Sequence, residues 1–278
     1  MSFGIFLAVL AAAFLHALWN ALIKLGTSKV GGMVILSIVE VPIGLAVVMV
    51  SKAINPAAIP WVIAAGCTHF AYKFFLTYAY DRGDLSRVYP IARGAAPMIV
   101  ALFGAVFLAD AVTGREYIAI AVLAAGILLM ARGVFASGED RRLLPFAIGS
   151  ACATATYTLI DGMGARVSGS PAAYVAWVFV ADGTIFTLGM LALRGIDVIP
   201  RNWRAWPMGA FASAASYGAY AVSIWAMTFA PIAVVAALRE TSILFAVLIG
   251  WLVFGERMTG EKALASVIIV AGVMLTRL

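Results

Sequence analysis

The sequence predicts an all-α integral membrane protein in which ten transmembrane helices form two inverted five-helix repeats. Three observations lead to this fold class: an apolar composition, ten apolar runs of membrane-spanning length, and a pattern that occurs twice along the chain. Hydrophobic residues make up 64% of the 278 residues, charged residues make up 12%, and the mean hydropathy is +1.04. A soluble domain carries about a quarter charged residues, so water is not the main solvent of this chain.

The apolar runs define the expected helices. About twenty apolar residues cross a bilayer as a helix, and backbone that faces lipid must satisfy its own hydrogen bonds, which favours helices throughout. Ten apolar runs of about this length follow one another along the chain: 3–24, 30–51, 57–80, 86–108, 114–131, 143–164, 171–193, 203–229, 231–254 and 261–277.

The connections between these runs are short, and the most polar of them is Arg132–Arg142. We expect this linker to separate two repeats, residues 1–138 and 139–278. Each half has five spans, an odd number, so the second half must enter the membrane from the opposite face. Inverted repeats of this kind are typical of secondary transporters, whose substrate site lies near the midplane between the repeats.

A direct sequence match supports the duplication. Leu85–Arg132 and Pro231–Leu278 align without a gap at a shift of 146 residues. Each stretch has an Arg inside a long apolar run, then an acidic residue and a Thr-Gly pair, then a second apolar run. The matched positions are Arg93 with Arg239, Asp110 with Glu256, and Thr113-Gly114 with Thr259-Gly260.

Six charged residues lie near the middle of the predicted spans, where a charge costs at least about 3 kcal/mol. Three are basic and three are acidic: Lys73, Arg93, Arg239, Glu40, Asp182 and Glu240. Their signs balance, as mutual pairing requires, and Glu40 matches Asp182 at a shift of 142. Two interpretations stay open: a buried ion-pair lattice that fixes helix register, or side chains that face a water-filled cavity and bind a charged or zwitterionic substrate.

Uncharged polar and aromatic residues add candidates for the same site. His69 lies one turn from Lys73, and a histidine can titrate near neutral pH, so a proton-coupled step is one hypothesis and a hydrogen-bonded core histidine is the alternative. Mid-span tyrosines offer ring faces to an ammonium group. The candidate substrate-binding residues are His16, Trp19, Asn20, Glu40, His69, Tyr72, Lys73, Arg93, Asp182, Ser216, Tyr217, Tyr220, Arg239 and Glu240.

The fifth and tenth spans carry no interior charge and contain small residues, among them Gly126 and Gly272. Small faces let helices approach closely, so we interpret these spans as scaffold or as the interface of a homodimer. The sequence shows no Ser/His/Asp spacing, HExxH motif, phosphate loop or cysteine pair, so we expect no enzyme, no cofactor and no metal site. The net charge of +6 comes from single basic residues between apolar runs. This pattern indicates contact with anionic lipid rather than nucleic acid.

These features together resemble the EamA-type transporters of the drug/metabolite transporter superfamily. The resemblance covers nearly the whole chain. It rests on ten spans in two halves, the turn Gly255-Glu256-Arg257-Met258-Thr259 after the ninth span, and its echo after the fourth, where Ala109-Asp110-Ala111 replaces Gly-Glu-Arg. The resemblance implies a secondary carrier with its cavity between spans 1–4 and 6–9, and with spans 5 and 10 to the side. His16-Ala17-Leu18-Trp19-Asn20, followed by Lys24, is similar to a subgroup associated with phosphonate metabolism.

We therefore expect a multi-pass protein of the bacterial inner (plasma) membrane that moves a small polar or zwitterionic, amino-acid-like metabolite by alternating access. The resemblance implies export as the common direction, with import in some family members. The alternative is a flippase for lipid-linked substrates or a non-transporting membrane scaffold. Orientation stays open. Four Lys and Arg residues lie in loops on the face with both termini and twelve lie on the other face, which places the termini outside, whereas the family resemblance implies cytoplasmic termini.

Overall fold

The computed structural model describes residues 1–26, 28–80, 96–107, 110, 112–136, 142–255 and 258–276. Within these ranges the chain is almost entirely helical and contains no strand, which confirms the all-α prediction. Five helical segments of the described part of the chain are long and apolar enough to cross a membrane: Phe3–Leu25, Lys29–Val50, Leu143–Ser168, Pro171–Arg194 and Ile232–Phe254.

The helices follow the predicted spans closely. The first half contains α1 (Phe3–Leu25), α2 (Lys29–Val50), the 3₁₀ helix η1 (Pro56–Ala58), α3 (Ile59–Tyr80), α5 (Ala96–Phe107) and α6 (Gly114–Ala136). The second half contains α7 (Leu143–Ser168), α8 (Pro171–Arg194), the 3₁₀ helix η2 (Ile196–Val198), α9 (Ala205–Met227), α10 (Ile232–Arg239), α11 (Ser242–Phe254) and α12 (Gly260–Leu275). The fourth predicted span, 86–108, is described only as α5, and Arg93 lies outside the described residues.

Short polar side chains begin several of these helices. Ser2 accepts a hydrogen bond from the backbone N–H of Ile5 at the start of α1, and Ser28 does the same for Gly31 in α2. Such caps satisfy donors that the first turn of a helix leaves without a partner. A helix of 22 residues is about 33 Å long, so α2 and α3 match the thickness of the hydrocarbon core of a bilayer.

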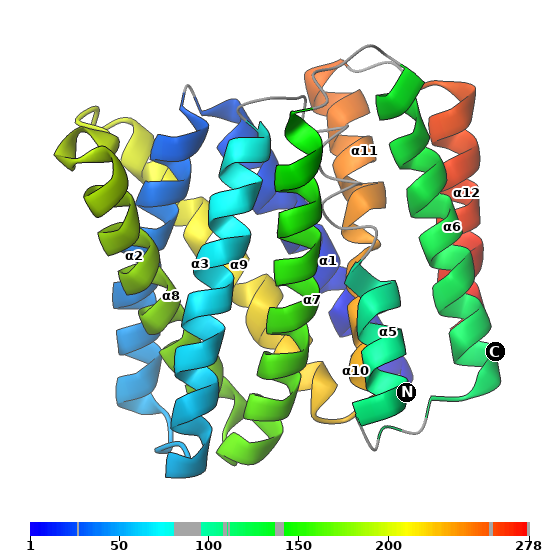
Figure 1. Cartoon of the computed structure of the whole chain (residues 1–278), viewed down its shortest axis with the longest axis horizontal. Coiled ribbons are helices and arrows are strands. Elements are labelled where there is room, and N and C mark those ends of the chain that lie inside the picture. Colours follow the sequence, from blue (N-terminus) through cyan, green and yellow to red (C-terminus); the bar gives the residue numbers. More distant parts are fainter. Residues whose placement is uncertain are drawn as a thin grey trace.

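The helices form one bundle in which each half packs against the other. The main helix pairs are α2 with α8, α3 with α7, α1 with α9, and α6 with α12. In each pair one helix comes from each half. Each span of the first half has a counterpart in the second half: the first corresponds to the sixth, the second to the seventh, and so on. If every span is replaced by its counterpart, the same four helix pairs result. Both chain termini lie at the same end of the bundle (Figure 1).

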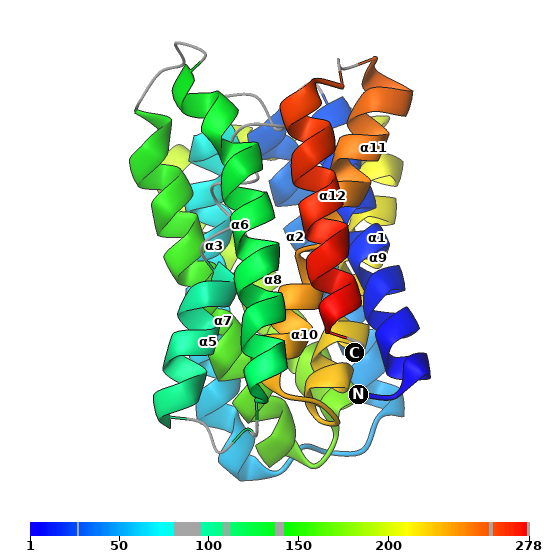
Figure 2. The ribbon, with the colours of Figure 1, turned by 90° about the vertical axis from the view of Figure 1, so that its right-hand side faces the viewer.

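The pair α6 and α12 stands to the side of the other helices (Figures 1 and 2). The small residues of these helices are used within the chain. A Cβ added at Gly126 on α6 would lie 3.1 Å from the carbonyl oxygen of Ala265 on α12, and one at Gly272 would lie 2.8 Å from the backbone nitrogen of Leu123. These contacts support the interpretation of α6 and α12 as scaffold, while a homodimer stays a prediction.

The ninth predicted span is not one regular helix, which corrects the expectation for residues 231–254. α10 ends at Arg239 and α11 begins at Ser242. Between them the N–H groups of Glu240 and Thr241 bond to carbonyl groups three residues earlier, those of Ala237 and Leu238. This tighter 3₁₀-like turn inside a longer helix is typical of a hinge or a strained site. Four consecutive polar residues, Arg239 to Ser242, are buried at this turn.

Candidate functional site

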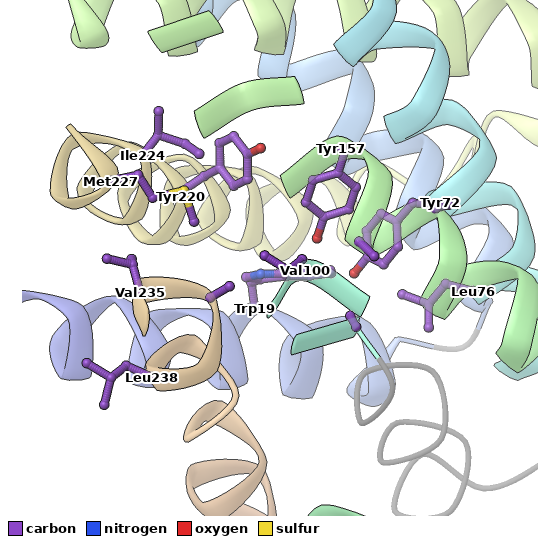
Figure 3. Close-up of a cluster of buried hydrophobic side chains, with 14 of the residues drawn as sticks. Trp19, Tyr72, Leu76, Val100, Tyr157, Tyr220, Ile224, Met227, Val235 and Leu238 are labelled. Atoms are coloured by element: carbon purple, nitrogen blue, oxygen red, sulfur yellow. The ribbon is translucent and has the colours of Figure 1, made fainter. Parts of the chain in front are cut away.

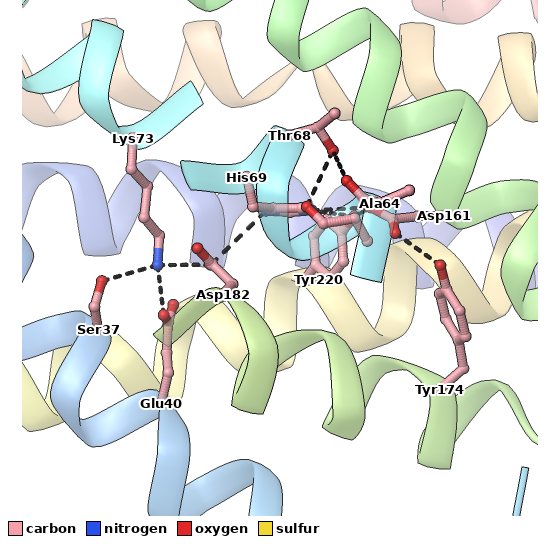
Figure 4. A network of polar contacts seen from close by, with 11 residues as sticks. Ser37, Glu40, Ala64, Thr68, His69, Lys73, Asp161, Tyr174, Asp182 and Tyr220 are labelled. Atoms are coloured by element: carbon pink, nitrogen blue, oxygen red, sulfur yellow. Dashed lines mark hydrogen bonds and ion pairs between the residues drawn. The ribbon is translucent and has the colours of Figure 1, made fainter. Parts of the chain in front are cut away.

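A lysine from the first half lies between two carboxylates, one from each half. The Nζ atom of Lys73 on α3 is 2.5 Å from Oε2 of Glu40 on α2 and 2.7 Å from Oδ2 of Asp182 on α8. It also donates a hydrogen bond of 3.0 Å to Oγ of Ser37. Lys73 is 4% exposed, and both carboxylates are 1% exposed. For these three charges the structure shows the buried ion-pair lattice (Figure 4).

The close approach of α2 and α8 brings the two carboxylates together. A Cβ added at Gly183 on α8 would overlap the carbonyl oxygen of Ser37 on α2, and one at Gly44 on α2 would lie 2.6 Å from the carbonyl oxygen of Ala176 on α8. Glycine at each position therefore lets the two backbones touch. Asp182 immediately precedes Gly183, so this contact sets its carboxylate beside Glu40.

His69, one turn before Lys73 on α3, lies between two carboxylates of the second half. Its Nε2 atom is 2.9 Å from Oδ2 of Asp161 on α7, and its Nδ1 atom is 3.8 Å from Oδ2 of Asp182. Nε2 also lies 3.1 Å from the hydroxyl of Tyr220 on α9. The ring of Tyr157 stacks on the imidazole with centroids 4.2 Å apart.

Asp161 is the main residue that sequence reasoning missed. The predicted sixth span ended at residue 164, which placed Asp161 close to the membrane surface, whereas α7 continues to Ser168 and buries Asp161 completely. Its Oδ2 accepts a short hydrogen bond from Tyr220, and its Oδ1 accepts one of 3.0 Å from Tyr174. Gly164 makes room for Tyr174, because a Cβ there would overlap the tyrosine hydroxyl.

These contacts form one connected network that crosses the boundary between the halves (Figure 4). α2 and α3 contribute Ser37, Glu40, His69 and Lys73; α7, α8 and α9 contribute Asp161, Tyr174, Asp182 and Tyr220. Charged groups in an apolar interior must be paired and hydrogen-bonded to persist. Asp161 also changes the charge balance inferred from the sequence, since it adds a fourth acidic residue to the three that were counted.

Arg239 lies at the break between α10 and α11, next to this network. Its guanidinium carbon is 5.5 Å from the ring centroid of Tyr220, and the residue is 5% exposed. Among the described residues the structure shows no carboxylate within ion-pair distance of Arg239. The ring of Tyr220 thus contacts the arginine while its hydroxyl contacts Asp161, and the face predicted to receive an ammonium group is occupied by a guanidinium.

The three predicted site residues on α1, His16, Trp19 and Asn20, form hydrogen bonds with one another. Trp19 donates a hydrogen bond of 3.2 Å from Nε1 to Nδ1 of His16, and Asn20 donates one of 2.8 Å to the carbonyl oxygen of His16. Trp19 is 3% exposed and belongs to the same buried cluster as Tyr72, Tyr157 and Tyr220. Figure 3 shows these four aromatic side chains converging from α1, α3, α7 and α9.

The remaining candidates are placed less centrally. Tyr72 is buried and meets the network through the ring of Tyr157, with centroids 5.4 Å apart. Tyr217 is half-buried and packs its ring on Phe179, and Ser216 is also half-buried. Glu240 is buried at the break, beside Arg239. Arg93 cannot be compared with Arg239, because it lies outside the described residues.

One carboxylate oxygen of the network makes no hydrogen bond within the described part of the chain. Oδ1 of Asp182 is buried and has no hydrogen-bond partner among the described residues, although Oδ2 of the same carboxylate is bonded to Lys73. On α7, the hydroxyls of Ser150 and Thr154 are also buried without a partner in that part of the chain. Unpaired buried polar atoms are rare and call for an explanation.

A second ion pair joins the halves at the end that holds both termini. Arg166 near the end of α7 forms a two-pronged pair with Asp110, with distances of 2.6 and 3.1 Å. Asp110 also accepts the backbone N–H of Ile232 at the start of α10, at 2.8 Å. Arg166 donates further bonds to the carbonyl oxygens of Met227 and Ala230. The segment after α5 is thereby tied to α7 and to the turn between α9 and α10.

Two clefts lie at the opposite end of the bundle. One, with a volume of about 70 Å³, lies between α1, α2 and α9, and the other lies beside η2. Neither is lined by a predicted site residue. Among the described residues, no group of three or more His, Cys, Asp or Glu side chains is placed to hold a metal ion.

Comparison with known proteins gives two findings. The model of the EamA-like transporter family matches residues 142–278. A solved crystal structure is similar over 99% of this chain and 98% of its own, with a TM-score of 0.75 and 18% sequence identity, a likeness that shows the fold alone. No curated protein matches the sequence.

Proposed function

Because residues 142–278 belong to the EamA-like transporter family of the drug/metabolite transporter superfamily, we propose that this multi-pass membrane protein is a secondary transporter that moves a small zwitterionic metabolite by alternating access. The finer parts of the proposal are an amino-acid-like substrate, outward transport and coupling to protons. The family assignment favours a carrier over an enzyme.

The observation that carries the proposal is the buried polar network between the halves. Lys73 and His69 come from the first half, and each contacts carboxylates of the second half. In a purely structural bundle, apolar residues of similar volume would pack as well or better than buried ion pairs. Charges retained at mid-depth of a membrane protein are typical of substrate and ion pathways.

The arrangement of the helices supports alternating access between inverted repeats. Each half packs on the other through equivalent helix pairs, and the pairing is unchanged when the halves are exchanged. In Figure 1, α1 begins at the end with the termini and α7 begins at the opposite end. A rocking motion of two such halves exposes a central site first to one face and then to the other. The pair between Asp110 and Arg166 would hold one end closed in the conformation described here.

The buried groups suit a molecule that carries both an acid and an amine. Arg239 presents a cation without a carboxylate partner among the described residues, and a guanidinium binds carboxylate and phosphonate groups through paired hydrogen bonds. It lies at a helix break, where discontinuous transporter helices hold anionic substrate groups. Oδ1 of Asp182, buried without a hydrogen-bond partner among the described residues, is an acceptor for an ammonium group.

A transport assay in proteoliposomes tests the proposal. A panel of amino acids and aminoalkylphosphonates is first screened by thermal shift of the purified protein. Compounds that stabilise it are then measured in counterflow, in which unlabelled compound inside drives uptake of labelled compound. We expect counterflow with wild-type protein and at least a tenfold slower rate for Arg239→Gln, since one charge-assisted contact contributes about 1.5–3 kcal/mol.

Two results would count against this function. Absence of counterflow for every stabilising compound would favour the non-transporting scaffold, and transport limited to lipid-linked compounds would favour the flippase. Arg201→Gln is the matched control for Arg239→Gln, because Arg201 lies on the surface with its side chain 85% exposed. We expect this variant to keep the wild-type rate.

A further inference from the structure

His69 is surrounded by ionisable side chains from several helices. α7 presents Asp161 and Tyr157, α8 presents Asp182, and α9 presents Tyr220, while Lys73 follows on α3 itself. Behind these groups lie Tyr174 against Asp161, Glu40 against Lys73, and Arg239 over Tyr220. His69 is 5% exposed, so its protonation state is set by these neighbours.

The contacts of the imidazole define where a proton can bind. An ionised carboxylate only accepts hydrogen bonds. When Asp161 is ionised, Nε2 of His69, 2.9 Å from Oδ2 of Asp161, carries the hydrogen of this contact. In neutral imidazole the other nitrogen, Nδ1, then has a lone pair. That lone pair would face the Asp182 carboxylate at 3.8 Å, an unfavourable contact that becomes an ion pair once Nδ1 is protonated.

The balance of buried charges also favours protonation of His69. The network and its immediate neighbours contain three carboxylates, Glu40, Asp161 and Asp182, against two permanent cations among the described residues, Lys73 and Arg239. Buried charge without compensation is costly in an apolar interior. Protonation of His69 lowers this excess, and the unpartnered Oδ1 of Asp182 is a second acceptor in the same place.

From this geometry, and resting on the proposed transport function, we infer that His69, Asp161 and Asp182 form the proton-binding site that couples transport to a proton gradient. A proton from the aqueous phase bonds to the lone pair on Nδ1 of His69, and the charged imidazole forms an ion pair with Asp182. The proton comes from hydronium, whose O–H bond breaks as the N–H bond forms, so the site gains one positive charge and a water molecule is released. Release returns the proton to water on the other face.

Proton binding would change how strongly the halves hold together. With His69 charged, α3 of the first half is tied to α7 through Asp161 and to α8 through Asp182. With His69 neutral, α3 keeps its contact with α8 through Lys73 but loses the second ion pair to Asp182. Tyr220 links this change to Arg239, because it contacts Asp161 with its hydroxyl and Arg239 with its ring. Substrate at Arg239 and a proton at His69 can thus influence each other.

A spectroscopic experiment tests the proton site without any substrate. The chain has two histidines, so ¹⁵N-histidine labelling of the full chain in lipid nanodiscs gives two imidazole signals, and His16→Gln identifies that of His69. We expect both ring nitrogens of His69 to be protonated at low pH and one of them to lose its proton as the pH is raised. Asp161→Asn and Asp182→Asn should each change the signal in this titration. A wild-type His69 with one protonated nitrogen throughout would overturn the inference.

Transport measurements separate coupling from transport itself. In proteoliposomes, Asp161→Asn should lose accumulation driven by a pH gradient to a greater extent than it loses counterflow, because exchange at equal pH requires no net proton movement. Asp197→Asn is the matched control, since this carboxylate is 81% exposed and pairs with Arg201 on the surface. It should keep both activities.

The possible outcomes distinguish the two proposals. Counterflow in wild-type protein without any response to a pH gradient would overturn proton coupling and leave the transporter standing. Accumulation that requires sodium, and is unchanged when pH is equal on both sides, would also overturn the proton site. Absence of counterflow with wild-type protein would contradict the proposed function itself. If Asp161→Asn fails to fold, Tyr174→Phe, which removes one hydrogen bond to Asp161, should still alter the His69 signal.

Discussion

Lys73 on α3 and Asp182 on α8 lie 2.7 Å apart across the boundary between the two halves, with both side chains almost fully buried. Glu40 holds the other side of the lysine. The lysine thus forms an ion pair with one carboxylate of its own half and with one of the other. If the two halves move against each other, Lys73, Glu40 and Asp182 must either move together or change their partners.

The first prediction concerns removal of the shared lysine. Lys73→Met leaves Glu40 and Asp182 as buried carboxylates without their common cation, and breaking a buried pair in this way costs about 3–5 kcal/mol. We expect the variant to unfold at clearly lower temperature or denaturant concentration in detergent. The triple variant Lys73→Met, Glu40→Gln, Asp182→Asn should regain most of the loss, because it carries no unpaired charge. Equal stability of wild type and the single variant would show that the triad does not stabilise the fold.

The second prediction concerns the glycine that lets α2 and α8 touch. Gly183→Ala places a methyl group against the carbonyl oxygen of Ser37, and backbone cannot move aside as a flexible side chain can. We expect a loss of about 1–3 kcal/mol, the usual cost of overpacking. Gly218→Ala is the matched control on α9, since its nearest neighbour is the side chain of Leu15 at 3.4 Å. That change should leave stability unchanged or raise it by up to about 1 kcal/mol through better helix propensity.

The third prediction separates charge from geometry at Arg239. Arg239→Lys keeps the positive charge but loses the planar, two-pronged donor set of the guanidinium. If Arg239 binds an acidic substrate group, the lysine variant should raise the half-saturating substrate concentration by about tenfold, as for the loss of about 1.4 kcal/mol. Thermal stability without substrate should change much less. A variant with equal loss of stability and of transport would indicate that Arg239 mainly supports the turn between α10 and α11.

Much of the fold follows from composition and spacing alone. Membrane-spanning helices must satisfy their own backbone, so long apolar runs predict their positions, and the helices end within a few residues of the runs. The break in the helix after Arg239 could not be predicted from the length of the apolar run. Residues 231–254 form an uninterrupted apolar stretch apart from Arg239 to Ser242, and the tighter turn depends on where those four polar side chains are buried.

Part of the site could also be predicted from the sequence, because charged residues inside apolar runs are conspicuous. A charge in the middle of an apolar run is costly, so Glu40, Lys73 and Asp182 could be selected, and the structure places them in contact. Asp161 was missed because its distance from the end of α7 was underestimated, and no pattern near it marked the helix as continuing to Ser168. Its pairing with His69, 92 residues away, is a consequence of how α3 packs on α7.

The last prediction concerns the ion pair between Asp110 and Arg166 at the end that holds both termini. Asp110 bonds at once to Arg166 and to the first turn of α10, and Arg166 bonds to the carbonyl oxygens of Met227 and Ala230. Asp110→Asn removes the charge that holds these segments, so this end should open more often. A reporter cysteine at Ala230, which is 7% exposed, in a background with Cys67→Ser and Cys152→Ser, measures that opening.

Alkylation of the reporter by a water-soluble maleimide should be about tenfold faster in Asp110→Asn than in the unchanged background, as for the loss of one charge-assisted hydrogen bond of about 1.5 kcal/mol. Asp197→Asn, which removes an exposed pair at the other end of the bundle, should leave the alkylation rate unchanged. Because ions screen exposed pairs and the Arg166 side chain is 34% exposed, high salt should reduce the difference between the two backgrounds. Equal alkylation rates at low salt would show that this pair does not close the end of the bundle, and the closing contact would then have to be sought elsewhere between the halves.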